Sequence, residues 1–426
     1  MTVLNRKIAP DFKEIDSINF TLPEVKKLDN GIPFIQYNLG SQDLIKIDIV
    51  FNGGTKYQEK PLVAEFTNSM LREGTKNYSS LEIANKVDYY GAFLETDLNA
   101  DFATISLYTL NKYSKEVLPI LYEILTEVNF PEAEFNKQVK IKKQRYLINQ
   151  EKVETIASKA FSKIVFKGTA YESKTTPESF DEITVEDCKK FYQERYNLKE
   201  ANIFVAGKLD NSIFNLINES FGKLSINDVI PAFNFGKVNQ KSEFQYVDKP
   251  DAIQSSLRIG KPLVKINHPD FNKLQVLNTI FGGYFGSRLM ANIREDKGYT
   301  YGIGSVMMNR MEMGNLIIYT EVGKEVTQPA LDEIRKEITT LQTVKPSEEE
   351  LYKVKNYMLG SLLQNTDGAF DMLSRYKTLY YHNLPNNYYE QYIKEINSTT
   401  AEEILKLAQT YYNDLTFVVA GSQKVD

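Results

Sequence analysis

Hydrophobic and polar residues alternate at two places early in the chain, which predicts two strands with one face buried. An isoleucine or phenylalanine stands at every second position from 45 to 51, and Lys46 and Asp48 stand between them. Residues 101–110 alternate in the same way. A period of two indicates a strand because successive side chains of a strand point to opposite faces of the sheet.

Three helices are predicted around these strands. The first covers about residues 62 to 72 and ends before Gly74. Ser79 and Glu82 form a capping-box pattern that starts the second helix. Pro131 opens a long third helix, since proline is tolerated in a first turn. Strands and helices in this order, without the spacing of a dinucleotide-binding unit, favour an α+β lobe.

Two segments far apart in the chain resemble each other. Residues 196–209 read YNLKEANIFVAGKL and residues 412–423 read YNDLTFVVAGSQ, so both run from Tyr-Asn through an apolar strand to Val-Ala-Gly. Each follows a predicted helix that opens with a threonine and acidic residues. A repeat of this kind, in halves of similar length, indicates a duplicated unit.

The segment between the two halves has the pattern of a linker. Residues 222–248 show no helical periodicity and contain Pro231 and Gly236. We therefore expect an α+β fold with two homologous lobes of about 200 residues, each an antiparallel-rich sheet packed with helices. The N-terminal lobe is predicted to span 1–221 and the C-terminal lobe 249–426.

Composition excludes several classes of protein. The chain has 426 residues, of which 42% are hydrophobic and 25% charged, as in soluble globular proteins. Its net charge of −5 comes without a basic stripe, so a nucleic-acid partner is not expected. No apolar run is long enough to cross a membrane, so no membrane partner is expected.

The single cysteine and the start of the chain favour a cytoplasmic protein. Cys188 has no second cysteine for an internal disulfide, which fits a reducing compartment. The first residues have no signal-peptide pattern. A periplasmic location is the alternative if a leader has been removed.

Common catalytic motifs are missing from the sequence. His268 and His382 are far apart, and neither lies close to another histidine or a cysteine, as zinc sites require. His268 is expected in a loop and His382 at a helix end. Cys188 is expected to be a half-buried helix thiol rather than a nucleophile. The glycines of FGGYFGSRL (281–289) do not have phosphate-loop spacing and predict a tight strand-to-helix turn.

The chain nevertheless resembles a known family over almost its whole length. The resemblance in the first half rests on VFNGGTKYQ, MLREGTKNYSS, the turn at Gly91 and NFPEAEFNKQ. In the second half it rests on FGGYFGSRLMANIREDKGYTYGIGS and the closing FVVAG. These segments resemble the pitrilysin/insulinase family of inverzincins, especially its mitochondrial-processing-peptidase-like members.

Active members of that family carry H-x-x-E-H on the first helix, where two histidines bind zinc and the glutamate acts as general base. The resemblance places this motif on Glu65, Asn68 and Ser69, and the glutamate that is the third metal ligand on Arg145. An amide cannot take a proton from water, and an arginine brings a positive charge to a dication site. We therefore expect no metal and no cofactor on this chain.

The second half keeps more of the family pattern. Active members use an arginine and a tyrosine of the C-terminal lobe to grip the substrate and stabilise its oxyanion, and the resemblance places these on Arg294 and Tyr301. A guanidinium and a phenol are suitable donors to a developing negative charge. Tyr299 is the alternative if the frame shifts by two residues.

The resemblance thus implies half of an active site. Our hypothesis is a heterodimer in which this chain supplies Arg294 and Tyr301, while a homologous subunit with H-x-x-E-H supplies zinc for cleaving peptides or unfolded polypeptides. In active relatives the strand that corresponds to residues 92–98 pairs with substrate. Its AFLETDL lacks the usual Asn-Ala, so productive binding on this chain's own first lobe is not expected.

Two non-enzymatic alternatives stay open. One is a scaffold like the core subunits of the respiratory cytochrome complex, which share this fold. The other is a homodimer that binds peptides in an empty chamber.

Overall fold

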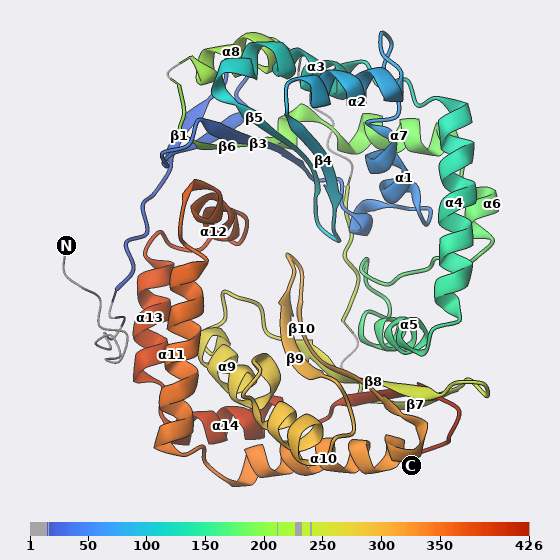
Figure 1. Ribbon diagram of the computed structural model, residues 1–426, viewed down its shortest axis with the longest axis vertical. Helices are drawn as coiled ribbons and strands as arrows, with labels where there is room; N and C mark the ends of the chain where they lie inside the picture. Colours follow the sequence, from blue (N-terminus) through green and yellow to red (C-terminus); the bar gives the residue numbers. More distant parts are fainter. Residues whose placement is uncertain (1–14, 16, 211, 226–231, 239–240, 426) are drawn as a thin grey trace, which may run out of the picture.

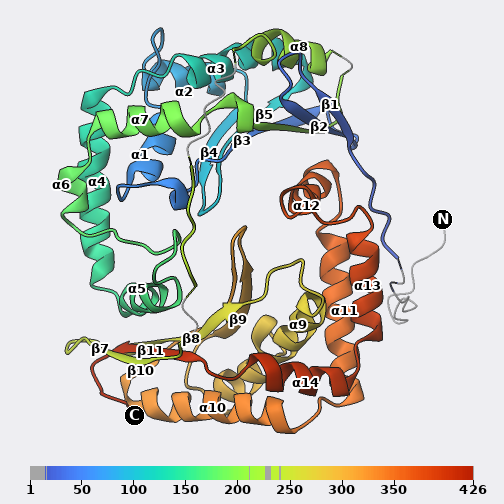
Figure 2. The same ribbon diagram turned by 180° about the vertical axis from the view of Figure 1, so that it is seen from behind.

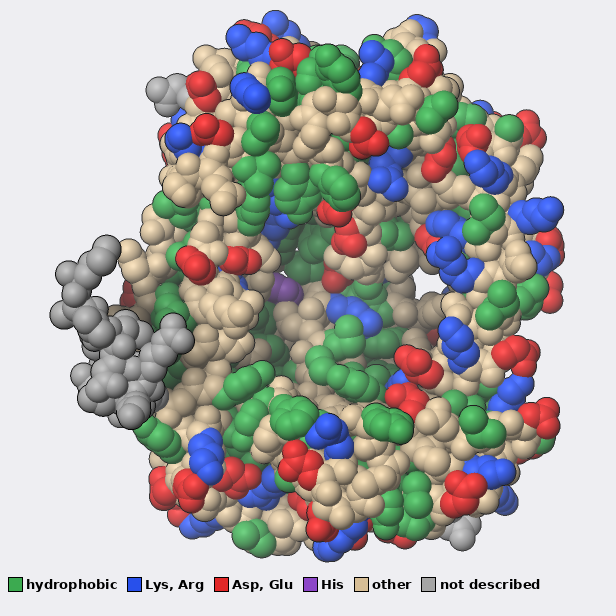
Figure 3. All heavy atoms as spheres, viewed as in Figure 1, with side chains coloured by type: hydrophobic (Ala, Val, Ile, Leu, Met, Phe, Trp, Pro, Cys, Tyr) green, Lys and Arg blue, Asp and Glu red, His purple; other side chains and the backbone are tan. Residues whose placement is uncertain are grey.

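Two α+β lobes face each other across a hollow in the molecule (Figures 1, 2 and 3). The computed structural model describes residues 15, 17–210, 212–225, 232–238 and 241–425. Each lobe is built around one sheet, and helices cover the outer side of both sheets. The predicted α+β fold with two lobes is confirmed.

Six strands form the first sheet in the order β1-β2-β6-β3-β5-β4. They are β1 (Glu24–Lys27), β2 (Pro33–Asn38), β3 (Leu44–Phe51), β4 (Phe93–Leu98), β5 (Ala103–Leu110) and β6 (Asn202–Gly207). β2 runs parallel to β6, and the other neighbours are antiparallel. The predicted strands at 45–51 and 101–110 are β3 and β5, and β4 lies at the edge.

The second sheet repeats this arrangement in the order β7-β11-β8-β10-β9. Its strands are β7 (Phe244–Asp248), β8 (Gln254–Leu263), β9 (Ile303–Asn309), β10 (Gly314–Gly323) and β11 (Thr416–Gly421). Again one pair, β7 and β11, is parallel and the rest are antiparallel. β11 is the counterpart of β6, so the topology supports the duplication predicted from the two Val-Ala-Gly segments.

The helices follow the same repeat. The first half forms α1 (Val63–Met70), α2 (Ser80–Tyr89), α3 (Ser114–Thr126), α4 (Glu132–Gln150), α5 (Val153–Val165), α6 (Ser179–Glu182), α7 (Val185–Arg195) and α8 (Ile213–Phe221). The second half forms α9 (Phe271–Asn278), α10 (Thr327–Thr343), α11 (Glu348–Gln364), α12 (Ala369–Tyr381), α13 (Tyr388–Ser398) and α14 (Ala401–Tyr411). The capping boxes at Thr184 and Thr400 start the equivalent helices α7 and α14.

The two halves exchange a helix. α12 of the second half packs on the inner face of the first sheet, where Met372 and Leu373 meet Tyr37 and Phe204. α5 of the first half packs on the second sheet, where Phe161 joins the same apolar cluster as strand β11. Figure 1 shows both helices between the sheets. Each sheet is therefore covered on one face by its own half and on the other face by the other half.

Buried charges also join the lobes. Asp48 of β3 is only 1% exposed and forms an ion pair with Lys377 of α12. The predicted half-buried strand is therefore wrong at this position, because α12 covers the face that the alternation left polar. A second group lies under the loop between β9 and β10, where Nζ of Lys56 lies 3.0 Å from Asp101 and 3.1 Å from Glu312.

Two segments near the predicted lobe boundaries do not follow the predicted division of the chain. Ile18 and Phe20, close to the start of the chain, pack against the core of the second lobe. Within the predicted linker 222–248, residues 244–248 form β7, and 226–231 and 239–240 lie outside the described residues. The boundaries 1–221 and 249–426 stay a prediction. The part of the chain that the structure describes contains no helix both long and apolar enough to traverse a bilayer.

Candidate functional site

Helix α1 carries the first three candidate residues. Its apolar face is buried through Ala64, Phe66 and Met70, so that the helix packs against the core of the first lobe. Glu65 and Ser69 are four residues apart and therefore share another face, which points towards α4. This is the place where the predicted motif requires its two metal ligands.

A lysine fills the space between these two positions. Nζ of Lys142 in α4 donates hydrogen bonds to Oε1 of Glu65 at 2.9 Å and to Oγ of Ser69 at 3.2 Å. The same ammonium lies 4.8 Å from the centre of the Phe66 ring. Gln138, one turn earlier on α4, accepts a hydrogen bond from Ser69 at 2.8 Å.

Asn68 has a structural role instead of a catalytic one. It is 4% exposed, and its Oδ1 accepts a hydrogen bond of 3.1 Å from the hydroxyl of Tyr196. Burial raises the pKa of Tyr196 well above its usual value, so this hydroxyl stays protonated and donates. The Asn68 side chain therefore satisfies a buried hydroxyl.

The structure does not bring Arg145 into this group. Arg145 is exposed on α4, and within the described residues the hydrogen bonds at Glu65 and Ser69 come from Lys142, one turn earlier. Counting residues along the family frame missed Lys142. A helical-face argument could have found it, because Gln138, Lys142 and Arg145 share one face of α4.

Arg294 and Tyr301 lie side by side in the second lobe. Arg294 belongs to a π-helical turn, η5 (Met290–Asp296), and its Nε donates a 3.0 Å hydrogen bond to the backbone oxygen of Tyr301. The guanidinium also lies 4.7 Å from the ring centre of Phe285, and Nη1 lies 3.7 Å from Glu295. Backbone and ring contacts thus orient Arg294 while leaving its side chain 35% exposed.

The Tyr301 side chain is 97% exposed and projects into solvent. Tyr299, the alternative from the sequence, instead packs against the core of the second lobe. An exposed phenol and a guanidinium that is bonded to the backbone of the same tyrosine are both hydrogen-bond donors that a bound chain could use. The geometry therefore favours Tyr301 over Tyr299 as the partner of Arg294.

The remaining candidate residues have structural surroundings. His268 lies in the loop before α9, and His382 ends α12, where its Nε2 lies 2.9 Å from Nδ2 of Asn309. The expected half-buried thiol is wrong in its burial, because Cys188 on α7 is fully buried in the core of the first lobe, and this burial raises the pKa of the thiol to about 12, which opposes formation of a thiolate. The expected strand-to-helix turn at 281–289 is wrong, because this segment connects two helical turns, η4 (Thr279–Gly283) and η5.

Comparison with protein families identifies the chain. A model described as insulinase (peptidase family M16) matches residues 40–178, and one described as peptidase M16 inactive domain matches residues 182–358. The first match lies within the first lobe, and the second begins in the first lobe, just before α7, and ends within α11 of the second lobe. The chain belongs to the insulinase family of peptidases, M16.

Some relatives of this chain are named as zinc proteases and others as homologues without peptidase activity. A Helicobacter pylori protein named non-peptidase homolog YmxG is 25% identical over 402 residues, which cover 89% of this chain and 89% of that protein. A Bacillus subtilis protein named uncharacterized zinc protease YmxG is 22% identical over 404 residues, covering 90% and 94%. The crystal structure of a peptidase M16 inactive domain from Pseudomonas fluorescens has a TM-score of 0.86 at 20% identity, covering 95% of this chain and 99% of that chain. Because the sequence identity with this crystal structure is low, the similarity shows that the two chains share a fold.

The residues of this M16 chain do not fit a zinc ion. The described residues contain no group of three or more His, Cys, Asp or Glu side chains that could hold a metal. Among the four positions that the resemblance assigns to the metal site, Glu65 carries the single carboxylate, and the ammonium of Lys142 donates a hydrogen bond to it. A cation that hydrogen-bonds the remaining ligand opposes a dication at the same place. The side chains at the positions assigned to the metal site therefore do not fit the zinc ion of active M16 peptidases.

Restoring the motif on α1 is not expected to restore zinc binding. The variant Glu65→His, Asn68→Glu, Ser69→His keeps Lys142 where the metal would lie, so its zinc content should stay well below one ion per chain. Adding Lys142→Glu removes the cation and supplies a carboxylate, and zinc content should then rise. Adding Arg145→Glu instead is the matched control. Elemental analysis after dialysis measures the outcome, and stoichiometric zinc in the three-residue variant would contradict the role given to Lys142.

Proposed function

We propose that this chain is the non-zinc subunit of a two-chain peptidase. In this proposal a homologous subunit brings H-x-x-E-H and zinc, and Arg294 and Tyr301 bind the peptide and the oxyanion that forms at that zinc. The main support is the contrast between the lobes. Lys142 occupies the metal position of the first lobe, whereas the side chain of Tyr301 is 97% exposed beside an oriented arginine.

The edge of the first sheet gives further support. Strand β4 is where a substrate strand would add to this lobe. The backbone oxygen of Leu94 in β4 already accepts a 2.8 Å hydrogen bond from Nη1 of Arg72. An incoming strand would have to displace Arg72 to pair at Leu94. Productive binding of substrate is therefore expected on the partner's first lobe rather than on this one.

A scaffold of the same fold is the second candidate. Arg294 stacks on Phe285 and lies close to Glu295, and a purely structural arginine would make the same contacts. The two candidates differ in what the chain does for a partner. A scaffold changes assembly, whereas a subunit of the active site changes the rate of hydrolysis.

Co-expression with a homologous H-x-x-E-H protein tests the proposal. The expected result is a stable complex that contains one zinc per pair and cleaves an unstructured peptide faster than either chain alone. Zinc content, sedimentation and release of a fluorophore from the peptide give the three measurements. If the partner alone cleaves as fast as the complex, the chain is not a subunit of the active site and the scaffold is favoured.

A further inference from the structure

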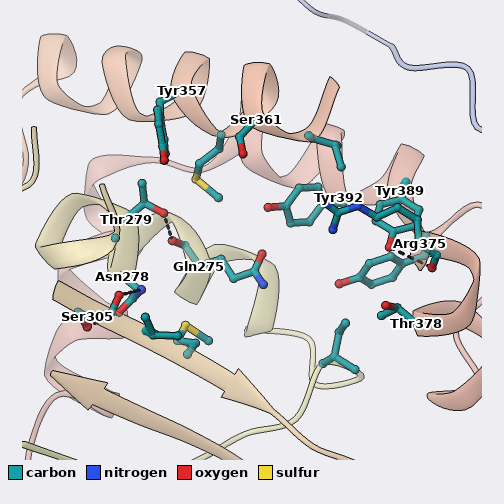
Figure 4. Close-up of a pocket in the computed structure, with 17 residues that line it drawn as sticks. Gln275, Asn278, Thr279, Ser305, Tyr357, Ser361, Arg375, Thr378, Tyr389 and Tyr392 are labelled. Atoms are coloured by element: carbon teal, nitrogen blue, oxygen red, sulfur yellow. Dashed lines mark hydrogen bonds between the residues drawn. The ribbon is translucent and has the colours of Figure 1, made fainter. Parts of the chain in front are cut away.

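The C-terminal lobe contains a cavity whose lining does not include Arg294 or Tyr301 (Figure 4). Its volume is about 360 Å³, and its walls come mainly from α9, η4, β9, α11, α12 and α13. This volume suits a ligand at the small end of the range of about 300–1,000 Å³ that protein ligand sites cover. Four tyrosines line the cavity, namely Tyr357, Tyr388, Tyr389 and Tyr392.

Arg375 of α12 brings a positive charge to this cavity. Its Nε donates a 3.2 Å hydrogen bond to the backbone oxygen of Asn365, and within the described residues no carboxylate forms an ion pair with it. Burial raises the pKa of the neighbouring Tyr392 to about 12, so this tyrosine is neutral and does not balance the charge. An unbalanced, half-buried guanidinium favours an anion, and a planar carboxylate matches its donor geometry.

Gln275 of α9 offers a second polar group. Figure 4 shows its side-chain amide pointing into the cavity. Its backbone oxygen accepts a 2.7 Å hydrogen bond from Thr279, but among the described residues no hydrogen bond to the side-chain amide is found. A polar side chain of this kind, with donors and an acceptor free, is suited to an amine or amide of a ligand.

The repeat explains why the cavity is open. Gln275 lies on α9, the counterpart of α1 in the second lobe, and Thr279, four residues later, begins the helical turn η4 that continues α9. The facing helix α11 presents Ser361 there, in contrast to the long side chain of Lys142 that α4 places against α1. A short side chain thus leaves a space in the second lobe that a lysine fills in the first.

We propose that this cavity binds a carboxylate ligand the size of one or two amino-acid residues. Arg375 binds the carboxylate, Gln275 binds an amine or amide of the ligand, and the tyrosines pack against its side chain. A free amino acid and the C-terminal residue of a peptide share this chemistry. The proposal goes beyond the role of Arg294 and Tyr301 and does not depend on a partner subunit.

Calorimetric titration of the intact chain tests this site. The probes are phenylalanine, the dipeptide alanylphenylalanine, its C-terminal amide, a hexapeptide that ends in phenylalanine, and inorganic phosphate. The expected result is binding of the dipeptide at least about tenfold tighter than of its amide, because a charged hydrogen-bonding pair is lost in the amide. Comparing the free amino acid with the hexapeptide decides between the two sources of the carboxylate.

Two variants change the cavity in different ways, so that a folding defect in one of them does not decide the result of the binding test. Arg375→Gln removes the charge, and Ser361→Leu fills the cavity while leaving Arg375 in place. Both should weaken dipeptide binding at least about tenfold. Lys353→Ala, at a 64% exposed position of α11, is the control and should bind as the unchanged chain does. Absence of binding at millimolar concentration, equal affinity for the amide, or binding of phosphate alone would overturn the proposal.

Discussion

Replacing Arg294 by alanine is expected to lower the turnover of the complex with a zinc-bearing partner about 100-fold or more. The guanidinium is held by the backbone of Tyr301 and the ring of Phe285, so it would enter the shared site already oriented. A pre-oriented donor stabilises the oxyanion more in the transition state than in the bound substrate. The loss should therefore appear mainly in kcat, with a smaller change in KM.

The variant Tyr301→Phe distinguishes the contribution of the hydroxyl from that of the aromatic ring, because it removes only the hydroxyl. Since Tyr301 is 97% exposed, losing its hydroxyl should leave the stability of this chain unchanged and still slow the complex. Tyr89→Phe is the matched control, because Tyr89 is 82% exposed on the other lobe. Tyr299→Phe should have little effect on turnover. A complex that keeps its full rate with both Arg294→Ala and Tyr301→Phe would rule out the shared active site, even if the two chains still assemble.

Much of the fold follows from local patterns in the sequence. The alternation at 45–51, the capping box at Ser79 and the two Val-Ala-Gly segments each correspond to an element of the structure. These patterns depend on neighbouring residues, so one chain segment is enough to reveal them. The duplicated topology followed because the same short segment occurs twice, at the ends of the two lobes.

The exchanged helices could not be predicted in this way. Asp48 stands at a polar position of an alternating strand, yet it is buried because α12 arrives from more than 300 residues further along the chain. The local pattern of apolar and polar residues shows which face of a strand is polar. It does not show whether an element distant in the sequence packs on that face. The burial of Asp48 in β3 could therefore be recognised only in the three-dimensional structure.

The candidate sites show the same limit. Arg294 and Tyr301 were predicted from the family frame, and the structure adds that the Arg294 side chain donates a hydrogen bond to the backbone oxygen of Tyr301. Lys142 was missed because the frame counts residues along the chain, whereas the contact depends on how α4 lies against α1. The cavity at Arg375 was also missed, since its lining residues come from several elements that are far apart in the sequence.

Replacing Asp48 by alanine is expected to reduce the free energy of unfolding by about 3 kcal/mol. The carboxylate accepts a 2.6 Å hydrogen bond from Ser106, pairs with Lys377 and lies 3.3 Å from Lys46, so its removal leaves two amines facing each other. Burial lowers the pKa of Lys377, and the charge of Asp48 opposes this shift, so the carboxylate favours the charged form of the amine. Urea denaturation followed by circular dichroism measures the change. Asp43→Ala is the control, since Asp43 is 67% exposed and its surface ion pair should contribute less than about 1 kcal/mol.

The double variant Asp48→Leu, Lys377→Met tests whether the pair itself joins the lobes. Replacing both charges by apolar side chains of similar size removes the Asp48 carboxylate from the hydroxyl of Ser106 and from Lys46, whose side chain is 22% exposed and can reach water. Such replacements are often close to neutral in other proteins, so the double variant should be more stable than Asp48→Ala. Because α12 and β3 belong to different halves of the chain, both lobes should also unfold in one transition in every variant. Separate transitions for the two lobes would show that the exchanged helices, and this ion pair with them, do not couple the halves.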